Sequence, residues 1–369
     1  MRKCQEVLGC VVAFMLLLAG CASPATPEPA TAADPSGSIT VTDALGRAVT
    51  LAQPPQRIVV AGKANFMLND AIYLFPEAPA RVIALTKAQQ NTDAFVALLD
   101  PDYAQKFRFT LSASAEEIAA VHPDLVILKG YMAESLGTPL EQLSIPVVYL
   151  DFETPEQYER DLGTLGQLFN DTARAGEVWG YFETQLDRVA TAVEGLSETD
   201  KPRVLVLQYT DKGGEIAFQA PPESWIQTQM VELSGGAPVW KEASQGGWAV
   251  VNFEQIAAWN PDQIFVINYF GNVDEVVAGL MSDPRWQQLA AVQAHQVYAF
   301  PKEYYSWDQP DTRWGLGLLW LAGRIHPERF PDLDLRAEID RFYGKLYGMD
   351  AATVAANVIP RLEGDVGAK

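Results

Sequence analysis

Histidine is the side chain most often used to bind a bare transition-metal ion, in pairs at a short spacing or together with cysteine and carboxylates. The chain has three histidines, His122, His295 and His326, and no two of them stand at such a spacing. We interpret all three as structural. We expect neither a metal-ion site nor a resident cofactor.

Three lysines, Lys63, Lys129 and Lys302, follow expected strands in a chain with 27 basic and 47 acidic residues. In open α/β sheets, ligands bind outside the carboxyl ends of the strands. These cations could therefore neutralise an oxyanion or the acidic groups of a metal chelate. The alternative is that each lysine points to solvent, as most lysines do.

Aromatic residues also gather in the loops that follow the strands. Their rings offer flat apolar surface with a phenol or indole donor at one edge, which suits a large planar or chelated ligand. Core packing is the alternative, and in glycine-rich or polar surroundings we favour binding. The candidates are Phe66, Tyr131, Tyr209, Trp225, Trp248, Tyr269, Tyr304 and Tyr305.

Two segments, 114–127 and 252–265, repeat one pattern of residue types. Each begins with Ser or Asn in a helix-capping position, carries a glutamate in the first turn, and runs through Ile-Ala-Ala to Pro-Asp and a strand. We expect Glu116 and Glu254 to present equivalent carboxylates to arginines of a two-fold symmetric receptor. Alternatively, they only complement the dipoles of their helices.

A series of α/β units must position these residues. Short apolar runs at 57–61, 81–85, 125–128 and 146–150 alternate with helical stretches, and a second series follows at 204–207, 263–267 and 297–300. Continuous runs of this kind are typical of parallel strands that helices cover on both faces. With a hairpin expected at 39–51, the sequence predicts an α/β protein with two Rossmann-like lobes and a ligand cleft between them.

Between the two series, apolar residues from Val178 to Leu196 recur at i, i+3, i+4 and i+7. This spacing predicts an amphipathic helix over about 172–196. Such a helix would be about 37 Å long, enough to connect the lobes and to limit their closure.

The N-terminus predicts export. Arg2 and Lys3 precede an apolar run at 11–18 that is shorter than the about 20 residues needed to cross a bilayer. Residues 18–21, Leu-Ala-Gly-Cys, resemble a bacterial lipobox, so we expect Cys21 to be acylated and to anchor an extracytoplasmic protein. The other cysteines, Cys4 and Cys10, precede it, and the mature body can hold no intramolecular disulfide. Residues 22–38 read as a flexible tether.

Composition and missing motifs narrow the function classes. A formal charge of −20 argues against binding to nucleic acid. The chain has no nucleophile elbow, phosphate loop, dinucleotide fingerprint or His-Glu-x-x-His motif, so we expect no enzyme. An exported α/β enzyme and a surface scaffold remain the alternatives.

The chain resembles the binding proteins of ABC importers for ferric siderophores, haem and cobalamin. The resemblance rests on the lipobox at Cys21, on 41–47 leading into 55–60, on the two Glu-x-Ile-Ala-Ala-x-x-Pro-Asp units, on the connecting helix, and on Pro284-Arg285-Trp286. It covers about 39–330. The aromatic stretch at 304–310 and the segment at 313–318 depart from the pattern.

This resemblance implies a cleft that holds an iron chelate, haem or a related metal complex, or alternatively a corrinoid or an oxyanion such as molybdate or tungstate. It implies docking to an ABC permease dimer with its cytoplasmic ATPase through Glu116 and Glu254, and we expect a monomer. The expected organisation is a signal peptide (1–20), a tether (21–38), an N-terminal lobe (39–165), a connecting helix (166–200), a C-terminal lobe (201–330) and a helical tail (331–369).

Overall fold

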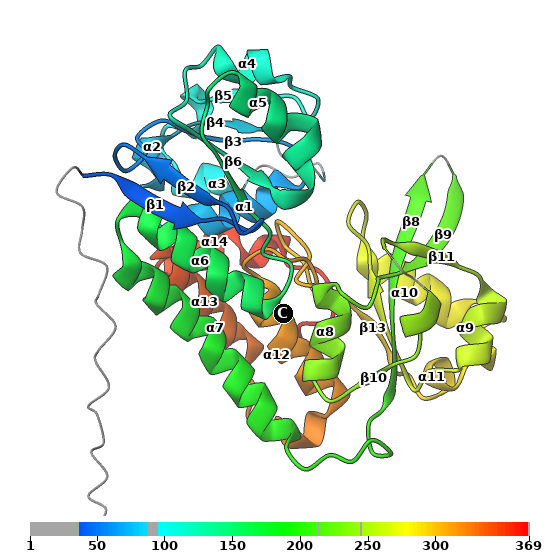
Figure 1. The fold of residues 1–369 in the computed structure, drawn as a ribbon. Helices are drawn as coiled ribbons and strands as arrows, with labels where there is room; N and C mark the ends of the chain where they lie inside the picture. Colours follow the sequence, from blue (N-terminus) through cyan, green and yellow to red (C-terminus); the bar gives the residue numbers. More distant parts are fainter. Residues whose placement is uncertain (1–36, 88–89, 91–94, 213, 244–245, 368–369) are drawn as a thin grey trace, which may run out of the picture. The chain divides into compact units, whose positions relative to one another are not determined.

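The computed structural model describes residues 37–87, 90, 95–212, 214–243 and 246–367 (Figure 1). The signal peptide, Cys21 and nearly all of the tether lie outside these residues. The expected hairpin is present, because β1 (Ile39–Thr42) and β2 (Ala48–Leu51) pair antiparallel. Among the described residues, no helix is long and apolar enough to cross a membrane.

The N-terminal lobe contains a five-stranded parallel sheet in the order β5-β4-β3-β6-β7. All four expected strands are confirmed. The fifth strand, β5, was not predicted, because its three residues form no continuous apolar run. The strands are β3 (Ile58–Val60), β4 (Val82–Thr86), β5 (Phe107–Phe109), β6 (Leu125–Lys129) and β7 (Val147–Leu150). The helices are α1 (Asn65–Ile72), α2 (Ala78–Arg81), α3 (Val96–Leu99), α4 (Ala115–Ala119) and α5 (Thr138–Gln142).

Both faces of this sheet are buried, which explains its continuous apolar runs. In β3 all three residues are fully buried. Ile58 and Val60 belong to the larger hydrophobic core, whereas Val59 belongs to a second, smaller core on the other face. Successive side chains of a strand point to opposite faces, so no polar alternation appears.

The C-terminal lobe contains a six-stranded mixed sheet. Its main path is β11-β9-β8-β12-β13, and β10 pairs with β8 off this path. The strands are β8 (Arg203–Lys212), β9 (Glu215–Ala220), β10 (Ala237–Pro238), β11 (Ala249–Val251), β12 (Gln263–Ile267) and β13 (Val297–Ala299). The helices are α8 (Ile226–Leu233), α9 (Phe253–Trp259), α10 (Val273–Ser282) and α11 (Ala290–Gln293).

The three expected strands of this lobe, β8, β12 and β13, pair in parallel. The antiparallel neighbours, β9 on β8 and β11 on β9, were not predicted. These strands are half exposed, so their apolar residues form no continuous run.

The predicted connecting segment contains helix α7 (Thr172–Val193), which Asp171 caps and which lies beside α6 (Pro155–Phe169) in Figure 1. It ends three residues before the predicted Leu196, because Gly195 adopts a left-handed φ of 79°. Three further helices follow the second sheet: α12 (Trp314–Ile325), α13 (Leu335–Tyr347) and α14 (Ala351–Asn357).

The sequence repeat corresponds to equivalent positions in the two sheets. Strand β6 lies beside β3, the first strand of its sheet in the chain, and β12 lies beside β8, the first strand of the other. Helices α4 and α9 precede β6 and β12, and each begins with a capping box, from Ser114 and from Asn252.

The Pro-Asp step of each repeat has a structural role that we call the strand-entry corner. Asp124 accepts hydrogen bonds from the backbone of Gln56 and Arg57, and the guanidinium of Arg57 donates to the carbonyls of residues 121 and 122. In the second lobe, Asp262 accepts from the backbone of Arg203, whose guanidinium donates to the carbonyl of Trp259. In each lobe an arginine and an aspartate thus tie the end of the repeat helix to the start of the first strand.

Candidate ligand-binding and docking sites

Two predicted ligand residues of the N-terminal lobe lie together. Tyr131 follows β6, its side chain is exposed, and its hydroxyl donates a hydrogen bond of 3.0 Å to the carbonyl oxygen of Lys63, which follows β3. Desolvation of the hydroxyl, together with the charge of Glu153, raises the pKa of Tyr131 to about 12. The phenol therefore stays protonated at neutral pH, and the side chain of Lys63, the residue whose carbonyl it binds, is exposed.

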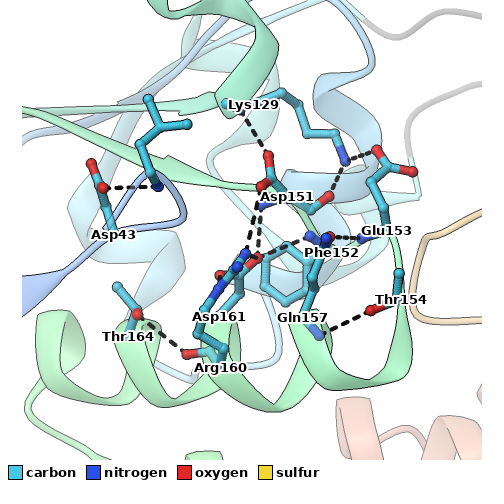
Figure 2. Close-up of polar contacts among 12 residues, drawn as sticks. Asp43, Lys129, Asp151, Phe152, Glu153, Thr154, Gln157, Arg160, Asp161 and Thr164 are labelled. Atoms are coloured by element: carbon cyan, nitrogen blue, oxygen red, sulfur yellow. Dashed lines mark hydrogen bonds and ion pairs between the residues drawn. The ribbon is translucent and has the colours of Figure 1, made fainter. Parts of the chain in front are cut away.

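Lys129, the last residue of β6, is buried within protein contacts (Figure 2). Its ammonium forms an ion pair of 2.5 Å with Glu153 and donates to the carbonyl of Asp151. The Asp151 carboxylate accepts from the backbone of Gly130, where a Cβ would lie 2.6 Å from it. The ammonium of Lys129 therefore holds the turn after β7, and its contact with ligand stays a prediction.

A buried carboxylate, that of Asp161 in α6, also binds this turn. It accepts from the backbone of Asp151 at 2.7 Å and of Phe152 at 2.9 Å, and it pairs with Arg160 at 2.7 Å (Figure 2). Burial raises the pKa of Asp161, which the arginine and the two N–H donors counteract. The loop after β7 is thereby fixed from both sides.

Three predicted aromatic residues of the C-terminal lobe form what we call the aromatic wall: Trp225, Trp248 and Tyr269. The rings of Trp225 and Trp248 meet edge to face at 5.6 Å, and those of Trp248 and Tyr269 at 6.2 Å. All three are partly exposed. Perpendicular rings at these distances make a stable apolar surface.

A buried carboxylate that was not predicted, that of Asp308, binds one member of the aromatic wall. Asp308 accepts from the hydroxyl of Tyr269 at 2.7 Å and from the amide of Gln227 at 3.1 Å. Burial raises the pKa of Asp308, and burial together with Asp308 raises the pKa of Tyr269. No motif marks Asp308, because its partners come from α8 and from the loop after β12.

Other predicted aromatic ligand residues are packed into the core. Phe66 and Tyr305 are almost fully buried and stack on each other at 4.5 Å, and the buried Tyr304 donates to the carbonyl of Asn357. These contacts favour the core-packing alternative for all three. Tyr209 is half-buried beside Phe218, with ring centres 5.9 Å apart.

Lys302 is also engaged by the protein. It donates to the carbonyls of Asn268 and Gly271 and lies 3.3 Å from the carboxylate of Glu363. Of the three predicted lysines, Lys63 is the one with its side chain exposed, and Lys87, which directly follows β4, is exposed as well.

The aromatic C-terminal stretch contains an arginine cluster that the sequence analysis missed. Arg313 is fully buried and pairs with Asp70 of α1 at 2.5 Å, with Glu303 at 2.6 Å and with Asp311 at 3.5 Å. Its guanidinium also lies over the ring of Phe95, 4.5 Å from the centroid. Because Asp70 and Phe95 belong to the N-terminal lobe, the cluster joins that lobe to the segment after β13.

The predicted docking carboxylates are both exposed, in the first turns of α4 and α9. Hydrogen bonds to its own backbone N–H and to Ser114 lower the pKa of Glu116, so this carboxylate is ionised at neutral pH. The capping boxes use Glu117 and Gln255, which leaves Glu116 and Glu254 free of that role.

The histidines occupy helix ends and turns. His122 and His295 have left-handed φ values of 52° and 55°, and the ring of His326 lies 3.2 Å from the carbonyl of Gly235. Within the described ranges, no group of three His, Cys, Asp or Glu side chains is placed to hold a metal ion.

The fold and these sites define a bilobed binding protein, and comparison with known families agrees. Residues 83–304 match the family described as periplasmic binding protein, and the chain belongs to this family. It is thus a solute-binding component of an ABC import system.

Relatives and solved structures are consistent with this assignment. The molybdate-binding protein MolA of Haemophilus influenzae is 25% identical over 256 residues, covering 64% of this chain and 70% of MolA. The Fe(3+) dicitrate-binding periplasmic protein FecB of Escherichia coli is 26% identical over 259 residues, covering 67% of this chain and 77% of FecB. A periplasmic solute binding protein from Veillonella parvula has the same fold, with a TM-score of 0.71 and 23% identity over 87% of this chain and 97% of that structure.

Proposed function

We propose that this protein is exported, anchored through a lipid on Cys21, and captures an iron chelate such as a siderophore complex or haem, which it delivers to a permease dimer. The aromatic wall is the observation that carries the choice of ligand. Partly exposed, mutually perpendicular rings suit a large complex with flat organic surfaces. The metal in such a complex is already coordinated, so the protein needs no ligand set of its own.

A corrinoid is a related alternative of similar size. An oxyanion such as molybdate or tungstate is favoured by the similarity to MolA and by the exposed side chain of Lys63 after β3. The chelate and oxyanion proposals differ in the lobe that should contribute most of the binding energy. A chelate would depend on the aromatic wall, and an oxyanion on Lys63.

The test is binding of ferric siderophores, haem, cobalamin and molybdate to the soluble domain, followed by native mass spectrometry and calorimetry. We expect one ligand at one-to-one stoichiometry. For a chelate, Trp248→Ala weakens binding at least tenfold, whereas Trp179→Ala on α7 does not. For an oxyanion, Lys63→Gln weakens binding, and Lys345→Gln in α13, which follows no strand, does not. If none of the probes binds, the ligand proposal is wrong, and turnover assays would then examine the enzyme alternative.

Docking to the permease is proposed to use Glu116 and Glu254. The double variant Glu116→Ala/Glu254→Ala should lose uptake in cells by at least tenfold while its affinity for ligand in solution is unchanged, because both carboxylates are exposed and neither takes part in the contacts of the aromatic wall. Glu156→Ala/Glu183→Ala is the matched control, because both of these carboxylates are exposed as well. Uptake that survives the loss of both glutamates would remove this proposal.

Membrane attachment is proposed to depend on the thiol of Cys21. Cys21→Ser should move the protein from the membrane fraction to the soluble fraction, because a single amino-acid change then removes the site of acylation. An intact mass without lipid for the wild-type protein would contradict the anchor.

A further inference from the structure

Two exposed apolar residues of the C-terminal lobe line one groove. Ile216 is 62% exposed and Phe270 is 58% exposed. Single exposed apolar side chains are ordinary, but two that line one hollow indicate an interaction surface. The groove has a volume of about 770 Å³ and lies between the end of the β8–β9 hairpin, the loop after β12, and α10.

The groove exists because the hairpin leaves the sheet. Strand β8 pairs with β12 only from Val204 to Gln208, and beyond Gln208 it pairs only with β9. Figure 1 shows the two strands extending past their neighbours. The floor is aromatic, since the ring of Trp286 lies 5.0 Å from that of Phe218.

This groove adjoins one of the predicted docking carboxylates. Trp286 also contacts the ring of Phe253 at 5.8 Å, and Phe253 is the neighbour of Glu254 at the start of α9. Arg285 lies on the rim, where Asp283 and, more weakly, Glu254 raise its pKa. The groove and Glu254 therefore belong to one continuous surface.

The charge of the rim is negative. The single arginine of the groove, Arg285, is paired with Asp283 at 2.9 Å. Asp211 and Glu275 also line the groove, and neither forms an ion pair with another residue that the structure describes. A partner that fits here must bring an apolar side chain flanked by positive charge.

We propose that this groove is a second part of the permease-docking surface, which receives an apolar side chain flanked by arginine or lysine on an extracytoplasmic loop of the permease. The inference rests on the proposed docking function. It assigns the β8–β9 hairpin, which has no counterpart among the described strands of the five-stranded N-terminal sheet, a role in recognising one permease subunit. Docking would then be asymmetric, with a carboxylate alone on one lobe and a carboxylate beside an apolar groove on the other.

The experiment measures binding of the soluble domain to the purified permease–ATPase complex in nanodiscs. Ile216→Ser and Glu275→Lys should each weaken binding at least fivefold, and the double variant at least twentyfold. Matched controls are Leu233→Ser on α8, an exposed aliphatic residue outside the groove, and Glu183→Lys on α7. A photo-reactive residue at position 216, but not at 233, should form a cross-link to a permease peptide that contains arginine or lysine.

Three results would overturn the inference. The first is wild-type affinity in the double variant. The second is a loss of affinity for whichever of ferric siderophores, haem, cobalamin and molybdate binds the wild type, because the groove, which the predicted ligand residue Tyr209 also lines, would then belong to the ligand site. The third is a wild-type dimer in sedimentation that the double variant abolishes, because the groove would then bind a second copy.

Failure of the docking proposal itself is distinguishable from these results. If the wild-type protein and Glu116→Ala/Glu254→Ala bind the complex equally, the carboxylates are not docking residues, and the basis of the inference is lost. If the loss of the glutamates weakens binding and the groove variants do not, only the groove is excluded.

Discussion

The two lobes repeat one another on one side of each sheet and differ on the other. Strands β3 and β6 correspond to β8 and β12, with the same strand-entry corner and a capped helix that presents a glutamate. Beyond the first strand, however, the N-terminal sheet continues with the parallel strands β4 and β5, and the C-terminal sheet with the antiparallel β9 and β11. The shared part contains the features that both lobes present alike, and the unshared part supplies Trp248 and one side of the groove.

The largest expected effect comes from breaking what joins the lobes. Arg313→Met keeps most of the apolar stem but leaves the buried carboxylates of Asp70, Glu303 and Asp311 without their cation. Removing one partner of a buried ion pair costs about 3–5 kcal/mol. We expect a loss of this size in the free energy of unfolding, measured in urea.

Arg336→Met is the control, because Arg336 lies on the surface of α13 and pairs with Asp340. If Arg313→Met lowers stability by no more than Arg336→Met, the lobes do not depend on this cluster and can be regarded as separate units.

The same cluster predicts an unusual dependence of stability on pH. Burial, opposed by Arg313, raises the pKa of Asp70 to about 6 in the native state, whereas an unfolded aspartate titrates near about 3.9. Between these values the native state binds more protons than the unfolded state, so stability increases as the pH falls from 7 towards 5. Asp70→Asn should reduce this increase in urea unfolding at pH 7.5, 6.5 and 5.5, and the remainder belongs to Asp311, whose pKa burial also raises. A dependence as large in Asp70→Asn as in the surface control Asp332→Asn would assign it to other groups.

A smaller difference in stability is expected between variants of the two strand-entry corners. Asp124 accepts two backbone hydrogen bonds, of 2.7 and 2.8 Å, and Asp262 accepts one, of 2.8 Å, because residue 202 is a proline without an N–H. With about 1 kcal/mol for each partly exposed bond, Asp124→Ala should cost about 2 kcal/mol and Asp262→Ala about 1 kcal/mol. Equal losses in thermal unfolding would mean that the second backbone hydrogen bond of Asp124 adds nothing to stability.

The sequence predicts the shared part of the lobes well, because that part depends on local signals. Buried parallel strands give continuous apolar runs, and capping residues mark both repeat helices. In the structure, each Pro-Asp step also contacts an arginine, Arg57 or Arg203. Both arginines follow a proline or Pro-Gln in the sequence, at 55–57 and 202–203, so a comparison of these segments could have predicted the contact.

The unshared part escaped prediction because it depends on contacts distant in the chain. Strands β9 and β11 are half exposed and short, so they lack the apolar run of β8 or β12. The roles of Asp308 and Arg313 depend on partners in α1, α8 and the loop after β12, which are distant from them in the sequence. Lys129 follows a strand like Lys63, yet its ammonium meets Glu153, and spacing alone does not distinguish the two lysines.

One of the C-terminal helices, α13, contacts α1, the first helix of the N-terminal lobe. The hydroxyl of Tyr347 in α13 donates to the carbonyl of Asp70 in α1, across a sequence separation of 277 residues. Contacts of such high separation slow folding, because a long loop must close before they form. The first lobe is therefore incomplete until the last helices have been synthesised, so the nascent chain is slow to reach its native state. A signal peptide at the same end would gain time to direct the chain to the export machinery before it folds.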